Sequence, residues 1–452
     1  MPRIIEQHKY RFIAIGVVAL SLLAGLAIPH VKSPLTNLTS AVNFPPTTCP
    51  SAMGGTSYIS LPSKNLEIRS INAHSLQTYK TTLTELTSTS VSKFATYVQG
   101  TVGLPITFDT TPSSASAAVL CSVGGQSEWF VGGTAGLSSQ GLFEIINSGL
   151  TPSSVLIYPY TPKGALPAIA MTIKANSLTH VPLVALAPGE DSVAFNVVTV
   201  TGRVTTFLLD HRKSGLTDLG SSFVAQTDQP ETTIYLGGIT NGSGSGSKAD
   251  SQKVRLLIPG QIDANISALV YSENGSFAPI GLSQLKVVHQ KVVDVALPTS
   301  EVPSPYGIVI TSDQPALASV LTTSGSSGND FAWANALTPI SSDKATPTLL
   351  NFAGATPTIV FMGNQIALDL SWQLATGKRG RTTLSGQGEL SWRAPGAVSA
   401  VSISLRNKVA TYAGAILGAQ SATLSYLPIT ANVAQNGSAL PVADIKTLTH
   451  HL

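Results

Sequence analysis

The sequence predicts a mainly β protein, in which an N-terminal transmembrane helix is followed by tandem β-sandwich modules of immunoglobulin-like type. Three observations predict this class. Charged residues make up only 11% of the 452 residues, against roughly 25% in typical soluble domains. An uninterrupted apolar run lies near the N-terminus, and a segment of roughly one hundred residues recurs further on. Because the chain is longer than one hydrophobic core usually organises, several domains are expected.

The low charge favours strands, because long surface helices usually need charged residues on their solvated faces, whereas Ser and Thr suit the polar face of a sheet. The net charge is +3, and the basic residues are scattered. Nucleic-acid binding needs a concentrated stripe of Lys and Arg that neutralises phosphates. The densest cluster is residues 378–381 (KRGR), which no aromatic residue interrupts and which fits a hairpin loop. No nucleic-acid partner is therefore predicted.

Residues 1–32 are predicted to be a cytoplasmic stub and a membrane anchor or signal segment. Three cationic residues precede an apolar run at 12–29, which as a helix is about 27 Å long and nearly matches a bilayer. The preceding charge favours a cytoplasmic N-terminus and an exported remainder. Small residues at 25–27 leave a cleaved signal peptide open, in which case the chain is secreted. The length of the run favours a retained, single-pass anchor, which makes the membrane a predicted partner.

Residues 33–125 are predicted to be a juxtamembrane segment and an N-terminal mixed β region. They contain Cys49 and Cys121, the two cysteines of the chain. Outside the cytoplasm an isolated pair indicates one disulfide. A metal pair or a redox pair fits less well, because no histidine cluster and no Cys-x-x-Cys spacing accompany them. Apolar residues near helical spacing predict a helix over residues 81–99.

The recurring segment begins at residues 128–133 (EWFVGG) and again, 105 residues later, at 233–238 (TIYLGG). A weaker third copy begins at 350–354 (LNFAG). Short alternating strands with turn signals every 8–12 residues are typical of β-sandwiches. The sequence thus predicts three sandwich modules: residues 126–228, 229–345 and 346–452. Short turns near the end of each module predict hairpins between the closing strands: residues 200–203, 312–315 and 406–408.

The sequence identifies no catalytic, cofactor-binding or metal-ligating residue. It has no Gly-x-Ser-x-Gly elbow, no phosphate-binding glycine loop between a strand and a helix, and no His-x-x-x-His pair. Asp210 and His211 are adjacent in a strand-like run, so they point to opposite faces and fit a surface hairpin end. The candidate carboxylates show no paired spacing of the kind glycosidases need: Glu128, Glu144, Glu190, Asp191 and Asp369. The chain is therefore predicted not to be an enzyme and to need no cofactor.

Aromatic residues carry the binding hypothesis, since carbohydrate-binding sandwiches stack sugar rings on exposed Trp or Tyr. Tyr158 and Tyr160, two apart in a strand-like run, share one face of the strand. Trp333 lies outside the repeated strand runs and fits either a core or a stacking role. These three residues are the candidates for ligand stacking. Trp129 and Trp392 lie inside strand-like runs and are predicted to pack in the core or between modules.

Several short motifs follow one another along the chain. They are the apolar anchor, Cys49 with Pro50, Cys121, residues 128–133, and residues 145–158 (IINS to VLIY). This layout resembles actinobacterial single-pass envelope proteins that carry a large conserved domain of unknown function. The resemblance covers the chain from the anchor through the second sandwich module. It implies an exported β-rich protein, and it brings no catalytic residues with it.

The expected function is a non-enzymatic, membrane-anchored envelope protein whose C-terminal ectodomain lies outside the cytoplasm. Its β-modules would serve as a binding or structural scaffold, and its partner would be a cell-wall glycan or another envelope protein. Two alternatives stay open. One is a cell-surface adhesin, and the other is a cell-wall glycan-processing enzyme whose site the sequence does not reveal.

Overall fold

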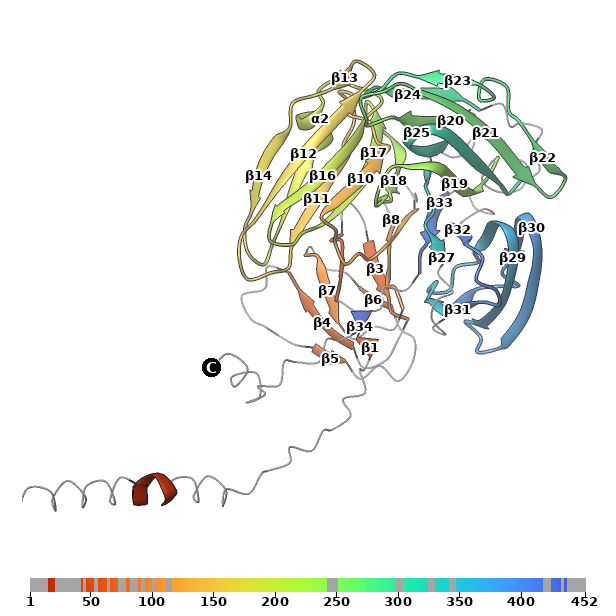
Figure 1. Ribbon diagram of the computed structural model, residues 1–452. Coiled ribbons are helices and arrows are strands. Elements are labelled where there is room, and N and C mark those ends of the chain that lie inside the picture. Colours follow the sequence, from red (N-terminus) through yellow and green to blue (C-terminus); the bar gives the residue numbers. More distant parts are fainter. Residues whose placement is uncertain are drawn as a thin grey trace, which may run out of the picture. The chain divides into compact units, whose positions relative to one another are not determined.

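A computed structural model shows the mainly β architecture that the sequence predicts (Figure 1). The described residues are the following: 15–20, 42–43, 46–52, 56–62, 66–71, 79–81, 88–90, 94–99, 103–110, 116–241, 251–297, 302, 304–323, 330–340, 347–417, 424–431 and 435–436. Among them, no helix has the length and apolar character that a membrane span requires. The predicted anchor is described only at residues 15–20, which are helical, and the rest of it lies outside the described residues.

The chain forms two compact units. The smaller comprises residues 1–43 and 435–452, in which β1 (Val42–Asn43) pairs with β34 (Gln435–Asn436). The larger comprises residues 44–434 and contains four sets of antiparallel sheets. We name these sets modules A (residues 47–120), B (127–224), C (231–335) and D (339–429).

Module A contains two four-stranded sheets, ordered β2-β7-β4-β5 and β6-β3-β8-β9. The helix predicted over residues 81–99 is wrong, because β5, β6 and β7 occupy its described residues. The Thr residues of this segment are β-branched and favour strands, and its Ser residues do not favour a helix interior, which outweighs the apolar spacing. The strands are β2 (Thr47–Cys49), β3 (Thr56–Ser60), β4 (Leu66–Ser70), β5 (Tyr79–Thr81), β6 (Ser88–Ser90), β7 (Thr96–Gln99), β8 (Ile106–Thr110) and β9 (Ser116–Leu120).

Module B has a five-stranded sheet (β10, β12, β13, β14 and β16) and a four-stranded sheet (β11, β15, β17 and β18). Its core is aromatic: the Phe143 ring meets Phe130 and Phe195 edge-on, with centroids 5.2 and 5.1 Å apart. The elements are β10 (Ser127–Val131), β11 (Leu142–Asn147), β12 (Ser153–Thr161), β13 (Gly164–Ala165), β14 (Ile169–Ile173), β15 (Ser177–Pro182), α2 (Leu183–Leu186), β16 (Ala194–Thr201), β17 (Thr205–Ser214) and β18 (Thr217–Val224).

Module C is one eight-stranded sheet folded into two layers. Its strand β25 is 18 residues long and crosses between the layers: its first half pairs with β19 and β21, and its second half pairs with β20 and β26. The strands are β19 (Glu231–Ile239), β20 (Ser251–Leu257), β21 (Ala264–Ser272), β22 (Gly275–Phe277), β23 (Leu285–Val287), β24 (Val292–Ala296), β25 (Tyr306–Thr323) and β26 (Phe331–Asn335).

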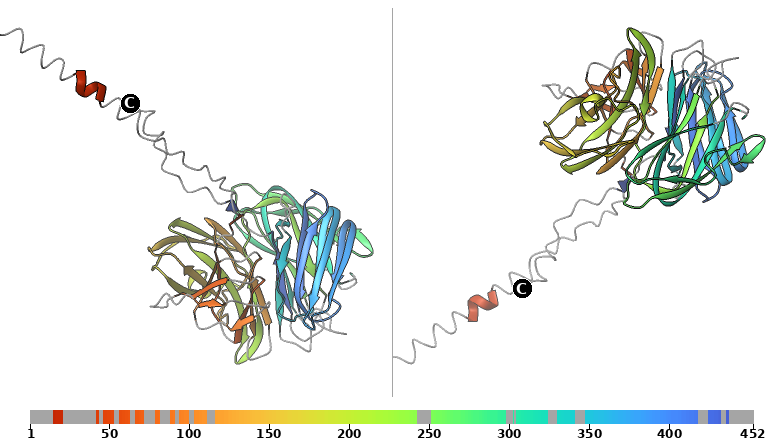
Figure 2. Two further views of the ribbon diagram at one scale, coloured as in Figure 1. Left: turned by 90° about the horizontal axis from the view of Figure 1, so that it is seen from below. Right: turned by 90° about the horizontal axis from the view of Figure 1, so that it is seen from above.

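Module D is a seven-stranded sheet built on long strands, coloured blue in Figure 2. Strand β29 spans 17 residues and pairs with β30 along its length, with β32 near its start and with β31 near its end. The strands are β27 (Pro339–Ile340), β28 (Thr348–Leu350), β29 (Thr358–Leu374), β30 (Arg379–Arg393), β31 (Val398–Leu405), β32 (Thr411–Leu417) and β33 (Ser425–Ile429).

The three predicted closing hairpins are wrong. Strands β16 and β17 flank the turn at 200–203 but belong to different sheets. Residues 312–315 lie inside β25, and the strands around residues 406–408 pair with β29 instead of with each other. A short polar turn between two alternating strands is compatible with a hairpin and also with a crossing between layers. Only the packing of the two layers decides between these outcomes.

The last strands of the four modules contact one another in a closed cycle. Strand β18 of module B contacts β9 of module A and β26 of module C, and β33 of module D contacts the same two strands. Buried side chains join the modules around this cycle. Asn335 accepts a hydrogen bond from the Ala225 amide, 2.9 Å, and Asp330 accepts one from the Leu424 amide, 2.8 Å. The larger unit is therefore one assembly of four interlocked modules.

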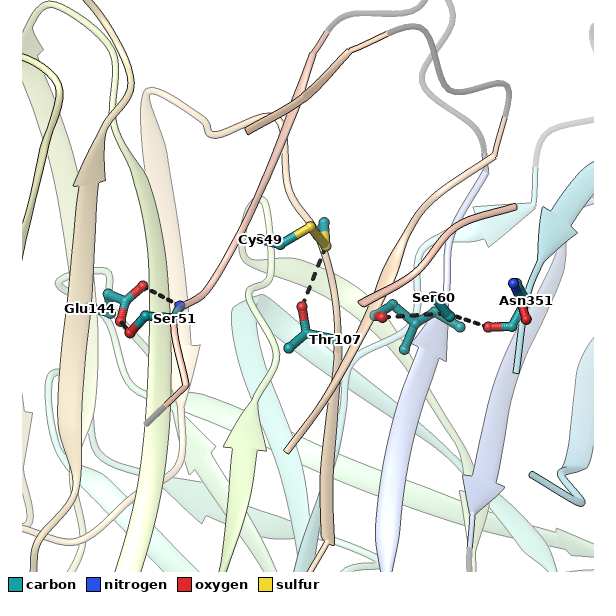
Figure 3. Close-up of a disulfide and its surroundings, with 8 residues drawn as sticks. Cys49, Ser51, Ser60, Thr107, Glu144 and Asn351 are labelled. Atoms are coloured by element: carbon teal, nitrogen blue, oxygen red, sulfur yellow. Dashed lines mark hydrogen bonds between the residues drawn. A yellow bond between two sulfur atoms is a disulfide. The ribbon is translucent and has the colours of Figure 1, made fainter. Parts of the chain in front are cut away.

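The predicted disulfide joins Cys49 at the end of β2 to Cys121 just after β9, and both cysteines are buried. Figure 3 shows that module A is held to its neighbours on either side of this bond. On one side, the Ser51 amide and hydroxyl donate to the buried Glu144 carboxylate of module B. On the other side, Asn351 of module D donates to the Leu61 carbonyl, 2.9 Å. The disulfide thus lies between two inter-module contacts.

The replacement His180→Gln is expected to lower stability at acidic pH and to lose this effect as the pH rises. His180 lies 2.8 Å from Glu144, and the hydrogen bond between them raises the pKa of the imidazole. Burial lowers this pKa by a smaller amount, and the charge of the Glu144 carboxylate raises it further. Such a histidine contributes stability that is complete below its unfolded pKa of 6.5 and is lost as pH rises through the folded pKa. The side chain is 43% exposed, so the contribution is below about 1 kcal/mol.

The measurement is urea unfolding of wild type and variant at about pH 5 and about pH 9, on either side of the histidine range. Gln can still donate one hydrogen bond to Glu144 but carries no charge, so the comparison isolates the charge. A difference between the two proteins that stays constant or grows with pH would show that the imidazolium is not stabilised by this contact.

Candidate functional site

A polar pocket of about 260 Å³ lies between modules B and C. Its lining comes from the loop after β10, the segment before β16, and strands β17, β18, β20, β24 and β25. In a chain with few charged residues, four cationic and two anionic side chains gather here. The polar lining residues are Thr134, Ser138, Ser139, Asp191, Ser192, Arg212, Lys213, Lys253, Arg255 and Asp294.

Local strand geometry brings the four cations together. Lys253 and Arg255 are two residues apart on β20, so they share one face of that strand. Arg212 and Lys213 are neighbours on β17 and would ordinarily point to opposite faces. The pairing of β17 with β18 shifts register between His211 and Lys213, and such a bulge re-aims side chains. Both residues consequently line the pocket.

Arg255 is the fixed centre of the pocket, with a side chain only 3% exposed. Its Nε and one terminal nitrogen donate to the two oxygens of Asp294, at 2.7 and 2.9 Å. The other terminal nitrogen donates across the module boundary to the carbonyls of Gly133, 2.6 Å, and Val193, 3.1 Å. Burial alone would raise the pKa of Asp294, but the hydrogen bonds and charge of Arg255, with smaller effects of the Ser192 hydrogen bond and the Lys253 charge, outweigh it, and the pKa is lowered. Asp294 is therefore an ionised, paired carboxylate.

A second charge pair lies next to the pocket and includes the lining residue Arg212. Asp210, which is fully buried, accepts two hydrogen bonds from Arg212, at 3.0 and 2.6 Å. It accepts a third from the indole nitrogen of Trp333 of module C, 2.8 Å. The guanidinium groups of Arg212 and Arg255 lie 5.7 and 4.9 Å from the Trp333 ring centroid, within cation–π range. The network therefore joins modules B and C through charge as well as packing.

The two lysines of the pocket differ from the two arginines. Among the described residues, the side chains of Lys213 and Lys253 make no hydrogen bond or close ion pair, although the charge of Lys253 acts on Asp294. Lys213 is half-buried and Lys253 is exposed. The pocket therefore offers two ammonium groups and several hydroxyl groups to a ligand, above a floor whose charges are already paired. Such an arrangement can hold a polar ligand by charge and hydrogen bonding.

The three predicted stacking residues do not form an exposed aromatic strip. Trp333 is 1% exposed and Tyr160 is 9% exposed, so neither ring offers a face to a ligand in this conformation. Tyr160 packs beside Trp129, with ring centroids 5.8 Å apart, in the cluster that joins module B to module C. Tyr158 is half-buried against the same cluster. Contact between modules covers these rings, which the sequence of a single module does not reveal.

The surface hairpin end predicted at Asp210 is wrong, because module C covers it. The alternation of residues along a strand predicts which face of the sheet a side chain lies on. It does not predict that a second module packs on that face. The signal that could have identified the residue is an Asp among apolar residues in β17 (TTFLLDHRKS), since a buried carboxylate needs a partner. Arg255, central to the pocket, could have been found by the same argument within β20 (SQKVRLL).

The carboxylates with raised pKa lie elsewhere. Burial raises the pKa of Glu128 in module B to about 8. Burial and the nearby charge of Glu273 raise that of Glu389 in module D to about 7. Neither residue lines the pocket. Within the lining, the carboxylate whose pKa is shifted is Asp294, and its shift is downward.

A second cavity, of about 370 Å³, is mostly apolar and is lined by strands and by segments that connect the modules. Its lining includes the disulfide residue Cys121, Gln226 and Thr338 from connecting segments, and Pro428 from β33. Its polar groups are few and scattered, so the cationic pocket is the stronger candidate site.

Comparison with known proteins gives a family and no activity. A family model described as "Family of unknown function (DUF5719)" matches residues 96–385, and no curated protein matches the chain. One solved structure, a tetra-tandem repeat in the extending region of a large adhesion protein, is 10% identical, with 87% of this chain and 94% of that chain covered and a TM-score of 0.12. Another, from infectious bursal disease virus Gx strain, is 12% identical, with coverages of 90% and 86% and a TM-score of 0.10. These TM-scores support no argument about fold or function.

Proposed function

The chain belongs to this DUF5719 family of unknown function, and from that premise we propose that it is a non-enzymatic binding scaffold that works outside the cytoplasm. The observation that carries the proposal is the interlocking of four β-modules around a pre-formed polar pocket. The last strands of the modules contact one another in a closed cycle, and the pocket lies on the boundary of two modules that buried hydrogen bonds from Arg255 and Trp333 hold together. A ligand can therefore bind without prior rearrangement.

The buried Cys49–Cys121 disulfide supports an extracytoplasmic location, because such bonds form and persist in oxidising compartments. The apolar run at residues 12–29 supports a single-pass anchor with a cytoplasmic N-terminus. If that segment is cleaved, the same ectodomain is secreted. The resemblance to actinobacterial single-pass envelope proteins supports the cell envelope as the site of action.

A non-enzymatic role is supported by the state of the carboxylates. A general acid or base needs a pKa near the working pH and access to substrate. In the pocket, Asp294 is held ionised. Of the two carboxylates with a strongly raised pKa, Glu128 is 3% exposed and Glu389 lies in module D, outside the pocket lining. The pocket is rich in hydroxyl and ammonium groups, which suits recognition of a polar partner. We propose a cell-wall glycan as that partner, with an envelope protein as the alternative outcome of the test.

The test is co-sedimentation of residues 33–452, which retain the whole compact unit 44–434, with isolated cell walls. Saturable pelleting that disappears after removal of the wall polysaccharides is the expected result. Pelleting that is indifferent to polysaccharide removal would replace the glycan by a protein partner. Absence of pelleting with either preparation, together with cross-links to no envelope protein in intact cells, would overturn the binding role.

A further inference from the structure

The geometry points to an oxyanion, a phosphate or a carboxylate, as the ligand group of the pocket between modules B and C. This inference rests on the proposed binding function and specifies its chemistry. We propose that Lys213 and Lys253 bind the anion, while the two arginines hold the pocket in shape. The group would be one residue of a larger polar molecule, such as an acidic sugar or a phosphate-bearing polyol.

The two arginines and the two lysines of the pocket have different roles. Arg255 uses its guanidinium on Asp294 and on two carbonyls of module B. The Arg212 guanidinium donates two hydrogen bonds to Asp210 and stacks over the Phe331 ring, 4.3 Å from its centroid. These charges are neutralised in place. They fix the walls of the site but are not available as the main attraction for an anion.

An ammonium group is a compact charge on a flexible stem with three donors. Lys213 comes from module B and Lys253 from module C, so the pocket places one cation on each side of the module boundary. Neither lysine side chain makes a hydrogen bond or a close ion pair with a described residue, although the charge of Lys253 helps to lower the pKa of Asp294, and cations outnumber carboxylates in the pocket. An oxyanion with two or three acceptor oxygens matches two ammonium groups that approach from opposite sides.

Thr134 and Ser138 line the pocket with hydroxyl groups that donate to no described residue. Asp191 also lines it, without an ion-pair partner among the described residues, and a carboxylate there accepts hydrogen bonds from ligand hydroxyls. A ligand with both an anionic group and hydroxyl groups satisfies all of these side chains.

At about 260 Å³ the pocket is smaller than the roughly 300–1,000 Å³ of most small-molecule sites. It therefore admits one charged unit of a polymer or one headgroup, and the rest of the molecule would extend into solvent.

The experiment measures binding of inorganic phosphate and of glucuronate to the full-length chain in non-ionic detergent by isothermal titration. The variant is Lys213→Gln with Lys253→Gln. The matched control is Lys291→Gln with Lys378→Gln, which removes the same charge from two exposed lysines outside the pocket. Equal thermal melting of all three proteins establishes that the substitutions leave the fold intact.

The expected result is binding of one anion per chain that weakens at least about tenfold in the pocket variant and is unchanged in the control. Binding should also weaken with added salt, because screening reduces attraction to a partly exposed site. Preference for phosphate or for glucuronate identifies which source of oxyanion the pocket takes. Binding of neither probe, or equal loss in both variants, would overturn the inference. Wall pelleting that persists in the pocket variant would overturn it too, yet leave the scaffold function standing.

Discussion

The double replacement Cys49→Ser, Cys121→Ser is expected to lower the free energy of unfolding by about 4 kcal/mol. The bond closes a loop of 72 residues, and cross-linking removes conformational entropy from the unfolded chain in proportion to the logarithm of loop length. The loop comprises nearly all of module A. Loss of the disulfide should therefore loosen module A first and, through Ser51 and Asn351, weaken the contacts with modules B and D.

The measurement is equilibrium unfolding in urea, together with hydrogen exchange, which reports the protection of the backbone amides in each module. Because both cysteines are buried, the serine hydroxyls could add a cost of their own. The Ala double variant is the matched control, and it should show a similar loss. Reduction of the wild type should reproduce the effect. Unchanged stability in all three cases would mean that the modules, not the bond, hold the N-terminal region.

The second large effect is expected from Asp210→Ala, at about 3 kcal/mol of unfolding free energy. This carboxylate is fully buried and accepts from Arg212 and Trp333. Its removal leaves a cation without a counter-charge and a buried indole N–H without an acceptor, and each costs free energy. The loss is below the upper range for buried pairs because the Arg212 side chain is 20% exposed and can recover some hydration.

The control is Asp369→Ala. Asp369 also pairs with an arginine, Arg381, at 2.7 Å, but that arginine side chain is 67% exposed. A pair so open to solvent contributes little to stability, because solvent screens the attraction between its charges. Urea unfolding of both variants decides the matter. Equal losses in the two variants would show that the Asp210 network adds nothing to the B–C interface beyond a surface ion pair.

The mainly β class, the disulfide and the repeat could be predicted, because each has a local signal. Low charge with abundant Ser and Thr favours strands, and an isolated cysteine pair in an exported segment predicts a bond. The hexapeptides at 128–133 and 233–238 correspond to β10 and β19, the first strands of modules B and C. The immunoglobulin-like type and the anchor stay predictions, and most of the anchor lies outside the described residues.

The pocket could not be predicted, because the residues that form it are separated in sequence and belong to two modules. Arg212 and Lys253 are 41 residues apart, and a register shift in β17 gives Arg212 and Lys213 a common side. Trp333 was expected as a possible stacking residue, but module B covers it. Strand periodicity assigns a side chain to one face of a sheet, and it contains no information on which other module covers that face.

Much of module A could not be predicted for a related reason. Its strands are three to five residues long, and Ser and Thr replace many of the larger apolar residues that make alternation visible. In the segment 81–99 the spacing of a few apolar residues suggested a helix, whereas pairing of β7 with β2 and β4 determines the observed strand.

The most direct test of the account compares three forms of residues 33–452 for pelleting with isolated cell walls: wild type, the Lys213→Gln, Lys253→Gln pair, and the Lys291→Gln, Lys378→Gln control. The account predicts that wild type and control pellet saturably with polysaccharide-bearing walls, while the pocket pair stays in the supernatant at the same protein concentration. If none of the three pellets, or if wild type pellets no better with intact walls than with stripped ones, the proposed wall-binding role is contradicted.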